Sequence, residues 1–174
     1  MQFKEPIELA QTLWPINRSI TGQGTLKSLQ ILRKILPDLK IRSIPTGTQC
    51  FDWTIPREWN VDDAYILCPS GEKICNFRQN NLHLVGYSVP INKTMDLDEL
   101  KSHLFTLPDQ PDAIPYVTNY YSEDWGFCLK HNDFINLKQG KYKVIINTRL
   151  TEGVLNYGEL ILPGTLNNEI FFST

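Results

Sequence analysis

Histidines are the first residues to consider for chemistry, because imidazole can act as a metal ligand and as a general base. The chain has three, His83, His103 and His131, and none belongs to an HxH motif, an HExxH motif or a spaced set of cysteines and histidines. A catalytic zinc needs about three protein ligands and an open position. We therefore predict no catalytic residue, metal ligand or cofactor in this chain. His83 is the best single candidate for contact with a substrate, and a structural role is its alternative.

The four cysteines, Cys50, Cys68, Cys75 and Cys128, form no zinc motif. Cys68 and Cys75 lie on the two arms of an expected hairpin, and six residues separate them, too many for a zinc knuckle. Diagonal positions on such a hairpin are roughly 7–8 Å apart, which is long for a disulfide. We expect reduced thiols, and a Cys68–Cys75 disulfide stays open. Cys128 is a weak candidate for a nucleophile, because Lys130 is its only basic neighbour.

A glycine-containing loop, Thr21-Gly-Gln-Gly-Thr25, resembles part of a phosphate-binding loop. A true phosphate loop follows a strand and precedes a helix, whereas a helical segment and Pro15 come before this one. We favour a capping role, in which Ser19 or Thr21 accepts hydrogen bonds from the next helix. Anion binding is the alternative, and Arg18 would support it.

Aromatic side chains are dense in the second half of the chain. Together with Trp53 and Trp59 they could form a wall that stacks against a sugar or a peptide, and packing in a core is the alternative. The residues concerned are Tyr116, Tyr120, Tyr121, Trp125 and Phe127.

Charge and hydropathy exclude several classes of protein. The net charge is −2, with about +4 in residues 1–50 and −6 in residues 51–174. The basic residues of segment 26–42 are expected on the solvent-exposed face of one helix, which argues against a nucleic-acid partner. No run of about 18 apolar residues is present, which argues against a membrane span. The amino terminus lacks a basic lead and an apolar core, so we expect no signal peptide and a cytoplasmic location.

The helices and strands that position these residues are predicted from the spacing of apolar residues and from the proline and glycine residues that end them. Helical spacing predicts a first helix that stops before Pro15 and a second over residues 22–36, whose Leu26, Leu29, Leu32, Ile35 and Leu36 should be buried. Short helices are predicted at 96–104 and 132–137. Alternation and turn residues predict strands at 40–44, 64–68, 73–77, 82–87, 141–146, 154–162 and 170–172. The pattern is of the α+β class.

Six segments together resemble one family, the bacterial aminopeptidase-like proteins of unknown function, some of them linked to surface-polysaccharide gene clusters. The segments are LWPINRSITGQG (13–24), FDWTIPREWN (51–60), NLHLVGYS (81–88), LPDQPDAIPY (107–116), WGFC (125–128) and YGEL (157–160). The resemblance implies a zinc-exopeptidase-like α/β domain interrupted by a β-rich inserted lobe, with a winged-helix domain farther on. Residues 1–48 and 148–174 would belong to the α/β domain, and residues 49–147 to the insertion.

The resemblance carries over no metal ligand and no catalytic residue. In the family, the metal-binding histidine and the catalytic carboxylate follow the strand that matches residues 170–174. The expected function is therefore the amino-terminal portion of a zinc-dependent aminopeptidase-like hydrolase, inactive alone, with zinc implied only for the full-length family and a peptide or modified sugar as its substrate. A complementary carboxy-terminal polypeptide is the expected partner. Our candidates for the substrate cleft are Arg18, His83, Tyr87, Tyr121 and Trp125. A stand-alone peptide- or carbohydrate-binding module, or a non-functional remnant, is the alternative.

Overall fold

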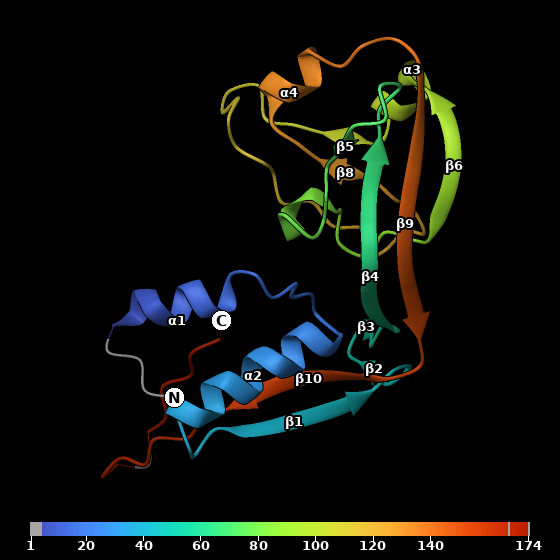
Figure 1. The fold of residues 1–174 in the computed structure, drawn as a ribbon. Coiled ribbons are helices and arrows are strands. Elements are labelled where there is room, and N and C mark those ends of the chain that lie inside the picture. Colours follow the sequence, from blue (N-terminus) through green and yellow to red (C-terminus); the bar gives the residue numbers. More distant parts are fainter. Residues whose placement is uncertain (1–4, 167, 174) are drawn as a thin grey trace.

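The computed structural model describes residues 5–166 and 168–173, which form an α+β structure of two lobes (Figure 1). The helical lobe consists of α1 (Pro6–Leu13), α2 (Gln23–Ile35), β1 (Lys40–Pro45) and β10 (Val154–Glu159). The β lobe contains the elements between β4 and β9. A small hairpin of β2 (Gln49–Cys50) and β3 (Trp53–Thr54) lies where the two lobes meet.

The helical lobe is built on a two-stranded antiparallel sheet with α2 against one face. β1 and β10 pair from Lys40 with Glu159 to Pro45 with Val154. Gly158 lets α2 approach the sheet closely, since a Cβ at this position would lie 3.1 Å from side-chain atoms of both Leu29 and Leu39. This narrow sheet sets a limit on how much apolar surface α2 can bury.

The β lobe is organised around a four-stranded antiparallel sheet with the strand order β5-β4-β9-β6. Its long central strands, β4 (Glu58–Leu67) and β9 (Lys141–Thr151), run on toward the helical lobe (Figure 1). The edge strands are β5 (Lys73–Ile74) and β6 (Ile91–Asp96). The remaining elements are η1 (Asn81–His83), α3 (Leu97–Lys101), β7 (Leu104–Phe105), β8 (Phe127–Cys128) and α4 (His131–Ile135).

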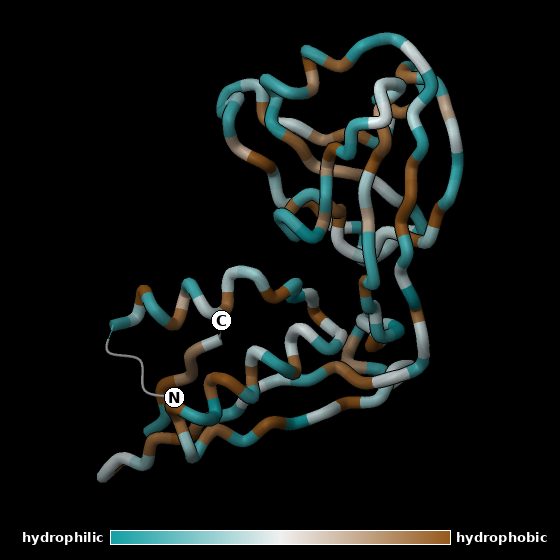
Figure 2. Tube along the Cα trace, viewed as in Figure 1, coloured by the Kyte–Doolittle hydropathy of each residue, from teal (hydrophilic) through white to brown (hydrophobic). Residues whose placement is uncertain are grey.

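The main hydrophobic core lies within the β lobe. Its members come from β4, β6, β9 and the segments packed over the sheet, and they include Ile66, Leu100, Phe127, Tyr142 and Val144. Brown, apolar stretches of chain meet inside this lobe in Figure 2. Each fully buried aliphatic or aromatic side chain contributes roughly 1.5–3 kcal/mol relative to exposure, so the β lobe holds most of the hydrophobic stabilisation.

Several predicted elements are confirmed with small changes at their ends. The helices before Pro15 and over residues 22–36 are present, as are the strand at 40–44 and the antiparallel hairpin around Pro69 and Gly71. The strand at 141–146 is longer than expected and runs to Thr151. The helices predicted at 96–104 and 132–137 are single short helices, α3 and α4.

Two predicted strands are wrong. Residues 82–87 do not form a continuous strand: η1 occupies the first part, and Tyr87 has a φ of 64°, which breaks extended geometry. Residues 170–172 pair with no strand in the described part of the chain, and β10 already ends at Glu159. A strand is stabilised by its neighbour, and these residues have no neighbouring strand to pair with.

The predicted burial of the α2 aliphatic face is only partly confirmed, because Leu26, Leu29 and Leu32 are half-buried. Ser28 is the only buried residue that α2 contributes, and Ile35 and Leu36 are about two-fifths exposed, at 38% and 41%. The carboxyl-terminal segment adds further exposed apolar residues: Leu160, Ile161, Leu162, Leu166, Ile170, Phe171 and Phe172. The reason is geometric, because a two-stranded sheet is too narrow to cover a whole helix face. The helical lobe therefore presents apolar surface that the β lobe does not cover.

Candidate functional site

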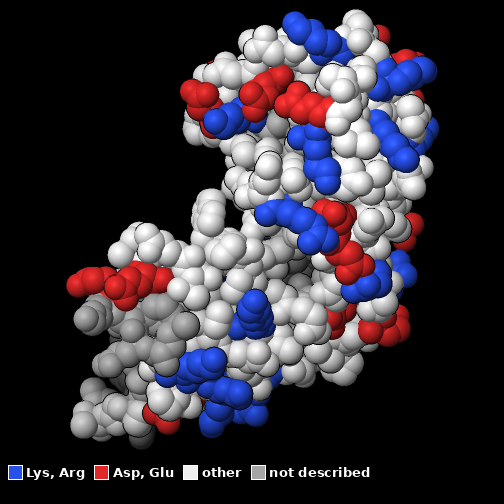
Figure 3. Space-filling model, viewed as in Figure 1, with Lys and Arg blue, Asp and Glu red and all other residues white. Residues whose placement is uncertain are grey.

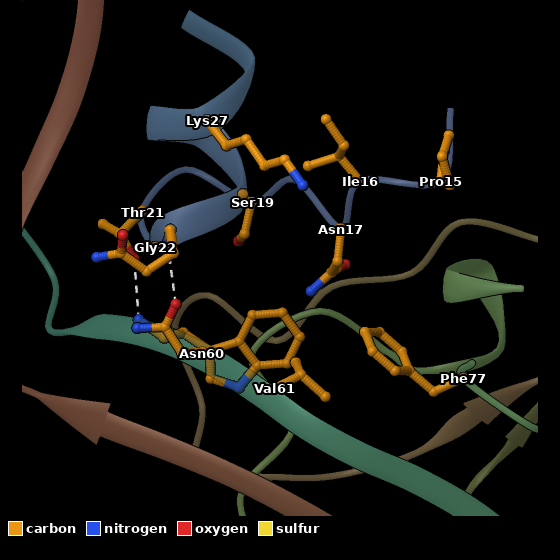
Figure 4. A pocket seen from close by; sticks show the side chains of 13 residues that line it. Pro15, Ile16, Asn17, Ser19, Thr21, Gly22, Lys27, Asn60, Val61 and Phe77 are labelled. Carbon is orange, nitrogen blue, oxygen red and sulfur yellow. Dashed lines mark hydrogen bonds between the residues drawn. The ribbon is translucent and has the colours of Figure 1, made fainter. Parts of the chain in front are cut away.

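A cavity lies between the two lobes, lined by the loop before α2 and by β4. Its volume is about 380 Å3, within the roughly 300–1,000 Å3 of small-molecule sites. The surface is indented between the lobes in Figure 3, and Figure 4 shows the cavity from close by. We call it the interlobe cavity. It is lined by Pro15, Ile16, Asn17, Ser19, Thr21, Gly22, Gln23, Gly24, Lys27, Trp59, Asn60, Val61 and Phe77.

The loop before α2 approaches the first residues of β4 very closely. Gly22 has a φ of 100°, and a Cβ there would lie 2.3 Å from the carbonyl oxygen of Trp59. Only glycine adopts this backbone conformation without strain. This glycine therefore allows the loop to form one wall of the cavity.

The predicted cap of α2 by Ser19 or Thr21 is wrong. The N-cap is Gly22, and the side chain that accepts from the first turn is Asn60 of β4, whose Oδ1 receives the Gln23 N–H at 2.9 Å. Thr21 instead points into the β lobe, where its hydroxyl accepts the Trp59 N–H at 3.1 Å. Asn60 thus joins the two lobes at the edge of the cavity.

Behind the cavity wall, aromatic rings form a continuous stack. Trp59 lies parallel to Tyr87 with ring centroids 5.5 Å apart, and Tyr87 meets the edge of Tyr120 at 5.2 Å. Burial raises the pKa of the Tyr87 hydroxyl, and its hydrogen bond with Thr21 opposes part of that rise. The stack fixes the Trp59 ring, which lines the cavity, so this wall is rigid.

The five candidates for the substrate cleft have different positions. Arg18 is exposed and lines a smaller hollow of about 30 Å3, which shares Asn17, Ser19 and Trp59 with the interlobe cavity. Tyr87 is buried directly behind Trp59. Tyr121 is 87% exposed and continues the stack through Tyr120, at a centroid distance of 6.5 Å.

The other two candidates lie away from the cavity lining. His83 is half-buried in η1, and its Nδ1 lies 2.7 Å from the carbonyl oxygen of Cys128. Trp125 is buried and stacks on His103, with ring centroids 3.8 Å apart. A substrate role for these two residues stays a prediction.

The sequence comparison assigns most of the β lobe to a known family. Residues 58–149 match the family model described as "Domain of unknown function (DUF2172)". The chain belongs to this family. Of the cavity residues, Trp59, Asn60, Val61 and Phe77 lie in the DUF2172 region, and the remainder precede it. The interlobe cavity therefore lies at the border between the DUF2172 domain and the segment before it.

Two relatives from Clostridium acetobutylicum extend the match beyond the DUF2172 region. A protein named "Putative polysaccharide biosynthesis protein with aminopeptidase-like domain" is 49% identical over 170 residues, which is 98% of this chain and 39% of that protein. A crystal structure described as a "putative peptidase" superposes with a TM-score of 0.83 at 50% identity, over 87% of this chain and 36% of the other. The chain thus corresponds to less than half of each relative, which is consistent with the amino-terminal portion of an aminopeptidase-like protein.

Neither the cysteines nor the other polar residues assemble a metal centre in the described part of the chain, where no group of three or more His, Cys, Asp or Glu side chains could hold an ion. Cys50, Cys68, Cys75 and Cys128 are all free thiols. No helix among the described residues is long and apolar enough to cross a membrane.

Sequence reasoning missed Lys27, Asn17 and Phe77 as cavity residues. The nearby glycine loop, Thr21–Thr25, is a usable signal, because its sequence favours capping or anion binding. Phe77 carried no signal, since it comes from the segment after β5 and reaches the cavity only through the fold.

Proposed function

We propose that this chain is the amino-terminal portion of a zinc-dependent aminopeptidase-like hydrolase, and that it has no peptidase activity by itself. The names of the two relatives support the reaction class, and the 39% and 36% of their lengths that match support the partial assignment. A catalytic zinc needs about three protein ligands, and the described residues do not supply such a set. We therefore derive no catalytic step from this chain.

The observation that carries the proposal is the uncovered apolar surface of the helical lobe. Phe171, Phe172 and Ile170 are more than four-fifths exposed, at 88%, 84% and 83%. Large contiguous apolar surface in a soluble protein marks a binding interface. We propose that a complementary carboxy-terminal polypeptide covers this surface and brings the zinc ligands.

Within such a hydrolase the interlobe cavity would form part of the substrate site. Trp59 is held by the Tyr87 stack and by a hydrogen bond of 3.1 Å from its Nε1 to the carbonyl oxygen of Ser88. A rigid apolar wall of this kind orients a substrate side chain and excludes water from its vicinity. This chain would thus bind and orient the substrate, a peptide or a modified sugar.

Turnover measurements test the proposal. The purified chain, with and without added Zn²⁺, is incubated with a panel of amino-acid p-nitroanilides, and the full-length relative from Clostridium acetobutylicum serves as the comparison. We expect no turnover by the chain alone and no stoichiometric zinc after dialysis. Addition of the carboxy-terminal part of the relative is expected to restore zinc-dependent turnover. Zinc-dependent hydrolysis by the chain alone would contradict the proposal.

A stand-alone carbohydrate- or peptide-binding module is the second candidate. The observation that favours it is the exposed end of the aromatic stack, where Tyr121 is 87% exposed. Beside it, Tyr116 is 66% exposed, and its hydroxyl lies 3.1 Å from the Tyr120 hydroxyl. Titration of tryptophan fluorescence with oligosaccharides and peptides tests this candidate, and an unchanged signal with every ligand counts against it. The cytoplasmic location stays part of our proposal, because free thiols persist in a reducing compartment.

A further inference from the structure

The interlobe cavity has two chemically different sides. Trp59, Val61 and Phe77 of the β lobe contribute the apolar side chains of one side. The other side carries polar groups of the loop before α2 and of its first turns. A ligand that fills such a cavity needs an apolar body and one polar end.

The polar side carries hydrogen-bond donors that have no partner in the described part of the chain. Lys27 forms no ion pair, and the Asn17 amide forms no hydrogen bond, so both are available to a ligand. Ser19 adds a buried hydroxyl, which interacts with the Tyr87 hydroxyl but forms no hydrogen bond of normal geometry. In Figure 4 the Lys27 side chain extends along the loop toward Asn17, whose amide points across the cavity toward Val61.

The electrostatic environment favours one negative charge on the ligand. Lys27 is the only charged residue in the cavity lining. The aligned peptide dipoles of α2 place partial positive charge at its amino-terminal end, and its first turn has no acidic residue to offset this charge. A carboxylate is nevertheless close by: Glu58 Oε1 accepts from Gln23 Nε2 at 3.2 Å and from Asn60 Nδ2 at 2.9 Å. The negative charge of Glu58 repels a doubly charged phosphate more strongly than a singly charged ligand.

We propose that the interlobe cavity binds the carboxylate end of a short peptide, with the terminal side chain against Trp59, Val61 and Phe77 and the carboxylate against Lys27 and Asn17. The inference rests on the proposed function in one respect, since it names the end of the substrate that this chain would hold. The carboxylate gains charge-assisted hydrogen bonds, which are about twice as strong as neutral ones. Free-acid peptides should therefore bind more tightly than their amides.

A matched pair of probes tests this preference on the purified chain. N-acetylphenylalanine carries the free carboxylate, and N-acetylphenylalaninamide has the same apolar body without the charge. We expect the acid to bind about tenfold more tightly by calorimetry, which corresponds to about 1.4 kcal/mol. Equal binding of acid and amide, or binding of neither, would overturn the proposal.

Two substitutions in α2 test whether Lys27 supplies the positive charge that attracts the carboxylate. Lys27→Gln should reduce the preference for the acid to about twofold or less, a change of about 1 kcal/mol. Lys34→Gln removes the same charge from an exposed position two turns along the helix and outside the cavity lining, so it should keep the preference. A loss of preference in both variants, or in neither, would contradict a specific role for Lys27.

A third variant and a competitor separate the two sides of the cavity. Phe77→Ala should weaken the binding of the acid and of the amide by the same factor, because it removes apolar contact area and leaves the polar groups unchanged. Inorganic phosphate should compete poorly, and phosphate that displaces the acid with equal affinity would reassign the cavity to simple anions. Unfolding curves of each variant show whether the fold is kept.

The cavity assignment and the proposed hydrolase function can fail independently of each other. If the chain prefers acids and the reassembled protein hydrolyses no peptide, the cavity stands and the hydrolase proposal fails. If the reassembled protein hydrolyses free-acid and amidated peptides at equal rates, and Lys27→Gln changes neither rate, the hydrolase proposal stands and the cavity assignment fails.

Discussion

The hydroxyl groups of Tyr87 and Thr21 lie 2.5 Å apart and join the loop before α2 to the interior of the β lobe. Thr21 is buried, and its oxygen also accepts the Trp59 N–H. Tyr87 in turn stacks on Trp59, which lines the interlobe cavity. This pair therefore couples the position of the loop to the position of the cavity wall.

Removal of the Tyr87 hydroxyl should destabilise the chain. Tyr87→Phe leaves the stack in place and deletes the hydrogen bond to Thr21, so we expect a loss of about 1–2 kcal/mol in the free energy of unfolding, measured with urea. Tyr121→Phe is the matched control, because that side chain is 87% exposed, and it should change stability by less than about 0.5 kcal/mol. Equal effects of the two substitutions would show that the hydrogen bond has no structural role.

Gly22→Ala should be far more damaging than the same substitution at an open glycine. The new Cβ would meet the Trp59 carbonyl oxygen at 2.3 Å, and the residue would keep a φ of 100°, so we expect a loss of about 2–5 kcal/mol. Gly71→Ala is the control, because Gly71 has a similar φ of 86° and a Cβ at this position would have no atom within 4 Å. The control isolates the backbone penalty of about 1–2 kcal/mol. If Gly22→Ala costs no more than Gly71→Ala, the close approach to Trp59 is not present in solution.

Asn60 should act as the cap of α2 although it belongs to β4. Asn60→Ala removes the acceptor for the Gln23 N–H, and caps of this kind are worth about 1 kcal/mol. Hydrogen exchange at the first turn of α2 should rise more than exchange in the centre of β9. Unchanged exchange at Gln23 would argue that water replaces the cap without loss.

The local parts of the fold were predictable from sequence, and the parts that depend on distant contacts were not. α2 and β1 follow from the spacing of Leu26 and Leu29 and from alternation after Lys40, which are local signals. The cap from Asn60 lies 37 residues from its helix, and no local pattern reports such a contact. Residues 82–87 look like a strand because Leu84 and Val85 are apolar. Both are buried, but the segment forms only isolated bridges, from Leu84 to Phe127 and from Gly86 to Thr118, and no continuous strand.

The candidate site shows the same division. The glycine loop identified one wall of the cavity, and the sequence segments that resemble the aminopeptidase-like family include Asn17 and Trp59. The opposite wall needs Phe77, which follows the β5 hairpin and meets the loop only after the lobes are assembled. Exposure of the α2 face was unpredictable as well, since amphipathic spacing says that a face can be buried and does not say what buries it.

Alkaline pH should destabilise the chain through its buried thiols. Burial raises the pKa of the Cys128 thiol from 9.0 to about 12, and burial also raises the pKa of Cys75. Above pH 9 the unfolded state loses these protons and the folded state keeps them, so the unfolded state is favoured as pH rises. We expect the free energy of unfolding to be constant with respect to these groups below pH 9 and to fall between pH 9 and 12.

A pair of cysteine variants checks the origin of this alkaline slope. Cys128→Ala should make the fall with pH shallower, because one raised pKa is removed. Cys50→Ala should leave the slope unchanged, since Cys50 is exposed. The same contrast should be visible in alkylation at pH 8, where Cys50 reacts and Cys128 does not. An unaltered slope in Cys128→Ala would assign the alkaline loss to other groups.

The exposed apolar residues of the carboxyl-terminal segment should govern association rather than folding. Ile161→Ser and Phe171→Ser together replace side chains that are 68% and 88% exposed, so the free energy of unfolding should change by less than about 1 kcal/mol. Binding of a hydrophobic dye and aggregation at high concentration should both decrease, because apolar surface is removed. Thr25→Ser serves as a control outside this surface. If the double variant unfolds more readily and aggregates as before, these residues pack within the chain and are not a surface for a complementary polypeptide.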